Sequence, residues 1–364
     1  MRFVKNLCIV EGKPERSAKI AQFPRLGNRL EAHIDQRLGR LKEWLTGQFG
    51  ADSFALAPAS EDASFRRYFR VTAGGQTWIA MDAPPEHEDC RAFVRIAALM
   101  RTAGLNTPEV LAQDIERGFL LLGDLGTTTY LSALNDSNCD DLFRDAVDAL
   151  LKLQRASRPG VLPPYDEALL RREVNLFPEW YIARHLGVEL NSPMKLALAE
   201  TVNMLVKNNL AQPAVYVHRD FMPRNLMVTE PNPGVIDFQD AVFGPITYDV
   251  VSLFRDAFVS WDEERVLDWT VRYWEKAKRA DLPVDTDFGA FYRDFEWMGL
   301  QRHLKVLGIF ARIRYRDGKP GYLDDTPRFV RYARAVCERY PELVALARLL
   351  DWLENRSPAV GYTF

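Results

Sequence analysis

Cysteine is scarce in this chain of 364 residues. Its four cysteines, Cys8, Cys90, Cys139 and Cys337, are far apart and form no C-x-x-C pair. Neither a disulfide framework nor a cysteine-based zinc site is indicated, so a reducing cytoplasm is the expected location.

The sequence also lacks long uncharged runs and a large excess of charge of one sign. No stretch approaches the length of a membrane span, and the apolar patch at 7–10 is too short for a signal peptide. The net charge of −3 gives no basic field that would attract nucleic acid or an anionic membrane. We therefore expect no nucleic-acid or membrane partner, and we expect a monomer.

The apolar content of 47% is ample for a core, and the length suits two lobes. Residues 1–33 lack periodicity and predict a poorly ordered N-terminal extension. Beyond them, Ile34, Leu38, Leu41 and Leu45 form one apolar stripe, which predicts a helix.

Residues 34–125 predict an N-terminal lobe built on a five-stranded antiparallel sheet with one inserted helix. The segment 64–71 has the alternating pattern of a strand, whose successive side chains point to opposite faces, so Phe65, Arg67, Phe69 and Val71 are expected on one face. The pair Gly74-Gly75 predicts a hairpin turn. The other elements expected here are a strand from Phe54, a strand at 77–81, a helix at 88–103, and strands at 109–113 and 118–122.

Residues 126–364 predict a larger, mainly helical C-terminal lobe, so the fold class is α+β. Three short apolar runs, at 215–217, 226–228 and 234–236, predict strands around a central loop. The expected helices are at 140–156, 167–186, 193–209, 247–259, 262–279, 288–315, 326–340 and 342–355.

The strongest chemical signal lies in that central loop. His218-Arg219-Asp220 is followed after four residues by Asn225, and Asp237 ends the third short strand. This spacing is that of an H-R-D-x-x-x-x-N catalytic loop followed by a metal-binding Asp, as in phosphoryl transfer. Asp220 is the expected catalytic base, which would also hold the acceptor hydroxyl. Asn225 and Asp237 offer oxygen ligands to Mg²⁺, and His218 is expected to shape the loop.

Through these motifs, the chain resembles the aminoglycoside phosphotransferase and choline kinase branch of the bilobal protein-kinase-like fold, over roughly residues 35–355. Several stretches are similar to the kinases that phosphorylate N-acetylmuramate and N-acetylglucosamine at carbon 1. The stretches that carry this likeness are Ala63-Ser64-Phe65-Arg66-Arg67-Tyr68-Phe69-Arg70, Met81-Asp82-Ala83-Pro84-Pro85-Glu86, Leu176-Phe177-Pro178-Glu179-Trp180, and 298–310.

The resemblance implies ATP and Mg²⁺ as cofactors, with a sugar as the small-molecule acceptor. It implies that Asp220 is catalytic and that Asn225 and Asp237 hold the metal. It also implies a hinge at 121–125, including Leu122 and Asp124, whose backbone meets adenine. Asp249 is expected to cap its helix and brace the loop.

One feature departs from the family pattern. Kinases of this fold carry a Lys on the third strand, and none is present at 78–82; the loop before 64–71 also lacks G-x-G-x-x-G. Either the chain is a degenerate kinase that binds nucleotide without transfer, or Arg66 or Arg67 supplies the missing charge for phosphate.

The acceptor pocket is expected to be basic. Arg302, Lys305 and Arg312 lie on one predicted helix, where they would suit an anionic acceptor such as a lactyl-bearing amino sugar, although a solvated helix face explains any one of them. The pair Glu179-Trp180 and the carboxylate Asp256 are further pocket candidates.

The sequence is compatible with three functions. The first is an ATP-dependent kinase for the anomeric hydroxyl of an amino sugar in peptidoglycan recycling. The second is a kinase of the same fold for an aminoglycoside, choline or a homoserine-like alcohol. The third is a nucleotide-binding pseudokinase. A protein kinase is disfavoured, because no A-P-E segment follows Asp237.

Overall fold

A computed structural model describes residues 27–60 and 65–354 of the chain. Most of the predicted extension, residues 1–26, lies outside the described residues. Helix α1 (Gly27–Phe49) begins seven residues before the apolar stripe, so the prediction that it starts near residue 34 was wrong. The described residues up to Ala55 belong to one compact unit, and those from Leu56 onward belong to the second, which carries the site.

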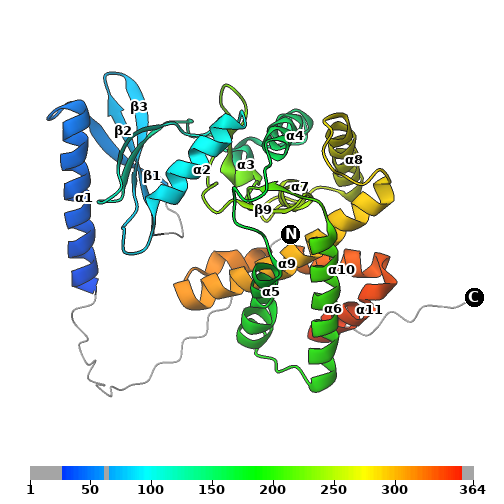
Figure 1. The fold of residues 1–364 in the computed structure, drawn as a ribbon. Helices are drawn as coiled ribbons and strands as arrows, with labels where there is room; N and C mark the ends of the chain where they lie inside the picture. The colour runs from blue at the N-terminus through cyan, green and yellow to red at the C-terminus, as the bar shows by residue number, and fades with distance from the viewer. Residues whose placement is uncertain (1–26, 61–64, 355–364) are drawn as a thin grey trace, which may run out of the picture. The chain divides into compact units, whose positions relative to one another are not determined.

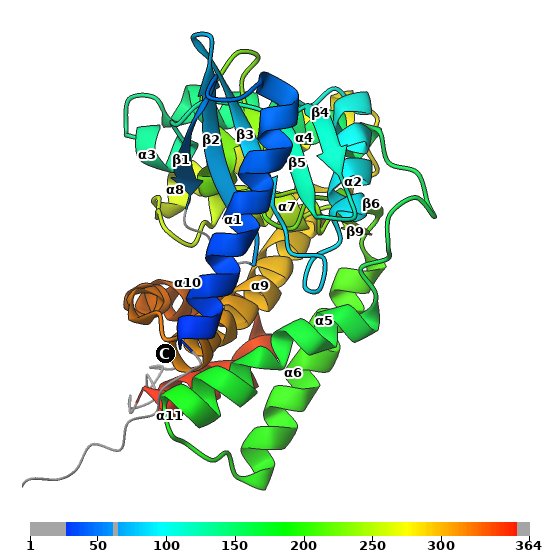
Figure 2. The same cartoon turned by 90° about the vertical axis from the view of Figure 1, so that its left-hand side faces the viewer.

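The five-stranded sheet predicted for the N-terminal lobe is confirmed, in the order β1-β2-β3-β5-β4 (Figure 2). The β2–β3 hairpin turns at Gly74 and Gly75, between the paired residues Ala73 and Gln76. Both glycines have positive φ, at 54° and 78°, as a two-residue turn of this twist requires. The strands are β1 (Ala55–Ser60), β2 (Arg67–Ala73), β3 (Gln76–Asp82), β4 (Val110–Asp114) and β5 (Phe119–Gly123).

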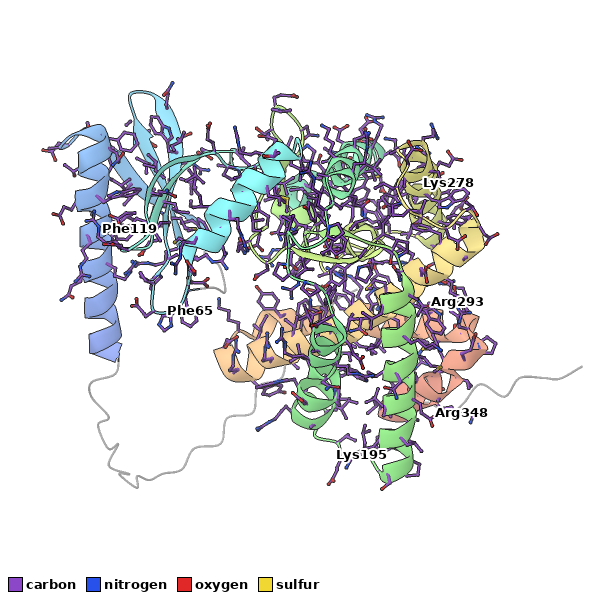
Figure 3. The ribbon with its side chains drawn as sticks, in the orientation of Figure 1. Phe65, Phe119, Lys195, Lys278, Arg293 and Arg348 are labelled. Atoms are coloured by element: carbon purple, nitrogen blue, oxygen red, sulfur yellow. The ribbon has the colours of Figure 1, made fainter. Side chains whose placement is uncertain are left out.

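Strand β2 starts later than its alternation predicted. Phe65 (labelled in Figure 3) precedes the strand, is 62% exposed, and stacks on the ring of His87. Arg67 begins the strand and is opposite Asp82 of β3, a fully buried carboxylate that accepts from the Arg67 Nε at 3.0 Å. The buried charge of Asp82 therefore fixes the Arg67 side chain.

Helix α2 (Cys90–Thr102) is the inserted helix of this lobe. The Asp89 side chain caps it by accepting from the N–H of Arg91, and its buried face includes Phe93, Ile96 and Met100. This i, i+3, i+7 spacing is the apolar stripe that a helix needs to pack on a sheet.

The remainder of the described chain is mainly helical, as predicted. In both views, α5, α6, α9, α10 and α11 gather in the lower part of the molecule (Figures 1 and 2). Within the described residues, no helix is both long enough and apolar enough to cross a membrane. The helices are α3 (Tyr130–Ala133), α4 (Cys139–Arg155), α5 (Glu167–Val174), α6 (Ser192–Ala211), α7 (Tyr248–Phe254), α8 (Glu263–Arg279), α9 (Phe288–Asp317), α10 (Thr326–Arg339) and α11 (Val344–Leu353).

Two helix predictions need correction. The helix expected over 167–186 divides into α5 and a π-helix, η1 (Phe177–His185). The helix expected over 247–259 ends at Phe254, because the Asp256 side chain accepts from the N–H groups of Phe258 and Val259 and so stabilises a turn.

Helix α9 forms the axis of the helical part. It packs against η1, α10, α6 and α7, and most of its residues from Phe295 to Ala311 are buried. It crosses η1 at Gly308, where an added Cβ would overlap the backbone carbonyl of Leu176. This glycine lets the two backbones approach closely.

Two small antiparallel sheets carry the central loop. Strand β6 (Ala214–Val217) pairs with β9 (Val242–Pro245), and β7 (Leu226–Met227) pairs with β8 (Gly234–Val235). Strand β9 was not predicted, since its Gly-Pro ending is typical of a turn. These sheets place the loop after β6 beside the residues that follow β8.

Candidate active site

The side chain of Asp249 stabilises the catalytic loop through hydrogen bonds to its backbone. This carboxylate lies in the first turn of α7 and accepts from the backbone N–H groups of His218, at 2.6 Å, and Arg219, at 3.0 Å. Burial raises the pKa of Asp249 to about 7, and the two N–H donors oppose that rise. The predicted bracing role is confirmed, whereas the helix-capping role was wrong, because the side chain reaches the loop instead.

His218 is fully buried within the loop. Its Nε2 lies 3.1 Å from the carbonyl of Ile236, and its Nδ1 is 3.3 Å from the N–H of Asp220. Burial lowers the pKa of His218 to about 4, so the ring is neutral at pH 7. A neutral ring that donates from Nε2 and accepts at Nδ1 connects the loop to the residue that follows strand β8 and shapes the loop.

Asp220, Asn225 and Asp237 converge on one cleft. The Asn225 amide donates to the carbonyl of Asp220 at 3.0 Å and to Asp237 Oδ2 at 3.3 Å. Gln239 donates to Asp237 Oδ1 at 2.8 Å. Asp237 has a φ of 65°, a left-handed conformation that costs energy for a residue other than glycine, and such conformations cluster at functional sites.

These residues fit a magnesium site. The Asn225 and Asp237 side chains contact each other through the Asn225 amide nitrogen, and they carry a neutral and a charged oxygen, which are the hard ligands that Mg²⁺ prefers. In the described part of the chain, no group of three or more His, Cys, Asp or Glu could hold a metal ion. Two protein ligands suit a Mg²⁺ ion that takes its other ligands from phosphate and water.

A buried charge cluster lies beside the catalytic loop, centred on Glu173 of α5. Its carboxylate contacts Arg219 Nη2 at 2.6 Å and Lys305 Nζ at 2.9 Å, and it accepts from the hydroxyl of Tyr165. Burial would raise the pKa of Glu173, but Lys305 and Arg219 outweigh it and lower the pKa. Lys305 also donates to the hydroxyl of Tyr248 at 2.9 Å. Glu173 therefore joins three segments: α5, the catalytic loop and α9.

The cleft has a volume of about 1200 Å³. Its nucleotide side includes Tyr68, Ile79 and the predicted hinge, with Leu122 and Asp124. The Asp124 carboxylate forms an ion pair with Arg70 of β2, whose Nε lies 2.7 Å from Asp124 Oδ2. Its other side is lined by residues of the catalytic loop and of the helical part. The latter are Tyr248, Ala257, Phe258, Arg302, Lys305, Val306, Ile309, Phe310, Ile313, Gly318, Lys319, Gly321, Tyr322 and Asp325.

Several predicted site residues do not line this cleft. Arg67 is paired with Asp82, and Arg66 pairs with Glu88 at 3.2 Å, although the charge of Asp237 helps to raise the pKa of Arg66 against burial. Their phosphate-binding role stays a prediction. The others outside the lining are fully buried His218 and Asp256, exposed Glu179 and half-buried Trp180 on η1, and half-buried Arg312.

Sequence reasoning missed Glu173 and Arg70. Glu173 stands 46 residues before Arg219 and 132 before Lys305, so no local spacing connects them. A lone Glu on an apolar helix face was the available signal, since charged residues are seldom fully buried unless paired.

Solved structures place this architecture among the kinase-like phosphotransferases. A choline kinase from Streptococcus pneumoniae matches with a TM-score of 0.57 and 11% identity, covering 81% of this chain and 99% of its own. The ADP-bound aminoglycoside phosphotransferase APH(2'')-Ib matches with a TM-score of 0.54 and 16% identity, covering 80% and 97%. At these identities the likeness concerns the fold.

The chain belongs to the phosphotransferase enzyme family, which it matches over residues 55–284. It is 57% identical over 304 residues to the N-acetylmuramate/N-acetylglucosamine kinase of Pseudomonas aeruginosa, covering 84% of this chain and 90% of that protein. It is 49% identical over 335 residues to the protein of the same name in Neisseria meningitidis serogroup B, covering 90% and 100%.

Proposed function

We propose that this protein is an ATP- and Mg²⁺-dependent kinase that phosphorylates the anomeric hydroxyl of N-acetylmuramate and N-acetylglucosamine, and that it acts as a cytoplasmic monomer in the recycling of peptidoglycan sugars. The observation that carries the proposal is the assembly of Asp220, Asn225 and Asp237 at one cleft, in a chain 57% identical to a kinase named for these two sugars.

Asp220 is the group that would act on the acceptor. Its carboxylate lies at the cleft while the loop around it is fixed by Asp249, His218 and Asn225. A carboxylate held in this way can orient the sugar hydroxyl and accept its proton as the phosphoryl group is transferred. Mg²⁺ held by Asn225 and Asp237 would neutralise charge on the phosphates.

The charge of the cleft lining supports an acceptor that is not polycationic. Among the described residues that line the cleft, the acidic ones are Asp124, Asp220, Asp237 and Asp325. Asp124 pairs with Arg70, and Asp325 pairs with Arg328. The two remaining carboxylates are assigned to the catalytic and metal roles. No further carboxylate of this lining is then left to pair with the ammonium groups of an aminoglycoside.

The test is ³¹P NMR of products after incubation with Mg-ATP and N-acetylmuramate, N-acetylglucosamine or kanamycin. We expect a sugar 1-phosphate from either amino sugar. Asp220→Asn should reduce the rate about 100-fold or more, as loss of a general base does. Phosphorylated kanamycin without sugar phosphate would favour the aminoglycoside alternative, and no phosphorylated acceptor would favour the pseudokinase.

A further inference from the structure

Two buried cations line the acceptor side of the cleft, on the same face of α9. Arg302 is 3% exposed and Lys305 is 9% exposed. They are three residues apart, which places them on neighbouring turns of the helix. Their electrostatic environments differ, and that difference assigns them different tasks.

Lys305 is neutralised within the protein. Its ammonium contacts the Glu173 carboxylate at 2.9 Å and the Tyr248 hydroxyl at 2.9 Å. Burial alone would lower the pKa of Lys305, but Tyr248 and Glu173 raise it above its usual range. Lys305 therefore stays charged and is already paired with a carboxylate at hydrogen-bond distance.

Arg302 has no such match. Its Nη1 donates to the carbonyl of Arg255 at 3.3 Å, and its Nη2 lies 4.0 Å from the sulfur of Met222. Among the side chains that the structure describes, no carboxylate forms an ion pair with this guanidinium. The carbonyl and the thioether carry no negative charge, and a buried cation without an anionic partner is costly unless an anion binds there.

The two buried carboxylates on which Arg302 acts electrostatically, Asp249 and Asp256, bind other groups. Asp249 accepts from the N–H groups of the catalytic loop, and Asp256 accepts from two N–H groups with one oxygen. Arg302 acts to lower the pKa values of both carboxylates, although burial is the larger effect and raises both. Arg302 therefore keeps most of its positive potential for the cleft.

The position of Arg302 is that of an acceptor contact. It contacts Met222, two residues after Asp220, and both Arg302 and Asp220 line the cleft. The surrounding lining is Tyr248, Phe258, Val306 and Ile309, which offer apolar and aromatic surface suited to a sugar ring. A sugar with a hydroxyl at Asp220 can thus present another substituent to Arg302.

We propose that the Arg302 guanidinium binds the carboxylate of the lactyl ether of N-acetylmuramate and thereby determines preference for this sugar over N-acetylglucosamine. The inference rests on the proposed function and adds the residue that separates the two acceptors. N-acetylglucosamine has the same ring and acetamide but no carboxylate. The planar guanidinium can hold a carboxylate through two parallel N–H···O bonds.

The experiment compares kcat/KM for both sugars in the wild type, Arg302→Gln and Arg302→Lys. Arg302→Gln removes the charge, and we expect kcat/KM to fall at least about tenfold more for N-acetylmuramate than for N-acetylglucosamine, chiefly through KM, as loss of a charged hydrogen bond predicts. Arg302→Lys keeps the positive charge but lacks the planar guanidinium with its two parallel donors. It should therefore change the ratio of kcat/KM between the two sugars less than Arg302→Gln does.

Lys305→Gln is the matched control, since Lys305 lines the same cleft but is neutralised by Glu173. It should lower the rates with both sugars in similar proportion. Binding of N-acetylmuramate without ATP, followed by calorimetry, should weaken in Arg302→Gln and gives a readout independent of turnover.

Equal losses for the two sugars in both Arg302 variants would overturn the inference, because they would mean that the guanidinium serves the phosphates or the fold. If Arg302→Gln does not fold, the ratio in Arg302→Lys decides alone. If the wild type phosphorylates neither sugar, the proposed function fails first, and this inference fails with it.

Discussion

His218 illustrates how burial determines the task of a residue in the catalytic loop. The ring is fully buried, contacts the Ile236 carbonyl, and has its pKa lowered to about 4. A ring that is neutral at pH 7 cannot supply a charge to the phosphates, so its contribution is the shape of the loop around Asp220.

This lowered pKa predicts a pH-dependent stability. As the pH falls from 6.5 to 4, the unfolded state takes up a proton on His218 before the folded state does, so unfolding is favoured. We expect the wild type to lose roughly 3 kcal/mol more unfolding free energy than His218→Gln between pH 7 and pH 4, at about 1.4 kcal/mol per pKa unit. Urea unfolding at a series of pH values measures this.

Exposed His87 provides the control for that experiment. His87→Gln should follow the wild type at every pH. Parallel stability curves for the wild type and His218→Gln would contradict the assigned environment of His218.

At the residue scale, the sequence predicted the groups that lie within one loop. Asp220 and Asn225 are five positions apart, and Asp237 follows a short apolar strand, so local spacing revealed them. Glu173 and Arg70 were missed because their partners come from distant segments: Arg70 and Asp124 are 54 residues apart. Burial and pairing across the fold are properties that a single sequence does not display.

At the scale of elements, apolar periodicity predicted most helices and the five-stranded sheet correctly. It failed where a tertiary contact altered a regular pattern. The segment 167–186 has helical periodicity throughout, but it divides into α5 and the π-helix η1, which packs closely on α9. Periodicity does not reveal such a change of helix type, because the surrounding packing decides it.

The crossing of η1 and α9 depends on Gly308. Gly308→Ala would place a methyl group against the Leu176 carbonyl, and overpacking of this kind costs about 1–3 kcal/mol. We expect a lower unfolding free energy in guanidinium titrations. Because α9 also carries Arg302 and Lys305, we expect KM for the acceptor to rise as well.

Gly39→Ala is the matched control, since nothing lies within 4 Å of the added methyl group in helix α1. It should leave stability unchanged or raise it by up to about 1 kcal/mol, as helix propensity predicts. Stability of Gly308→Ala equal to that of the wild type would show that the crossing tolerates a side chain.

At the scale of the molecule, one cleft combines residues from the sheet, the hinge and the helical part. A ligand that contacts all three should stabilise the whole second unit. With Mg²⁺ and a non-hydrolysable ATP analogue at about 100 times Kd, we expect about 2.7 kcal/mol of added stability, visible as a higher Tm. Removing Mg²⁺ with EDTA should abolish most of the shift.

Asp237→Asn should lose the Mg²⁺-dependent part of that shift, because Asp237 is the charged member of the metal pair. Asp240→Asn changes an exposed carboxylate three residues later and should keep it. A full shift in Asp237→Asn would remove Asp237 from the metal site.

The contact between Arg219 and Glu173 also has a consequence for the regulation of this kinase. In many protein kinases, arginines hold the activation loop in its working position after a phosphate has been attached to that loop. Here the negative partner is a carboxylate encoded in the chain, and it is fixed by Lys305 and Tyr165 as well. The catalytic loop needs no signal to be assembled, so flux through this step would follow the supply of enzyme and sugar.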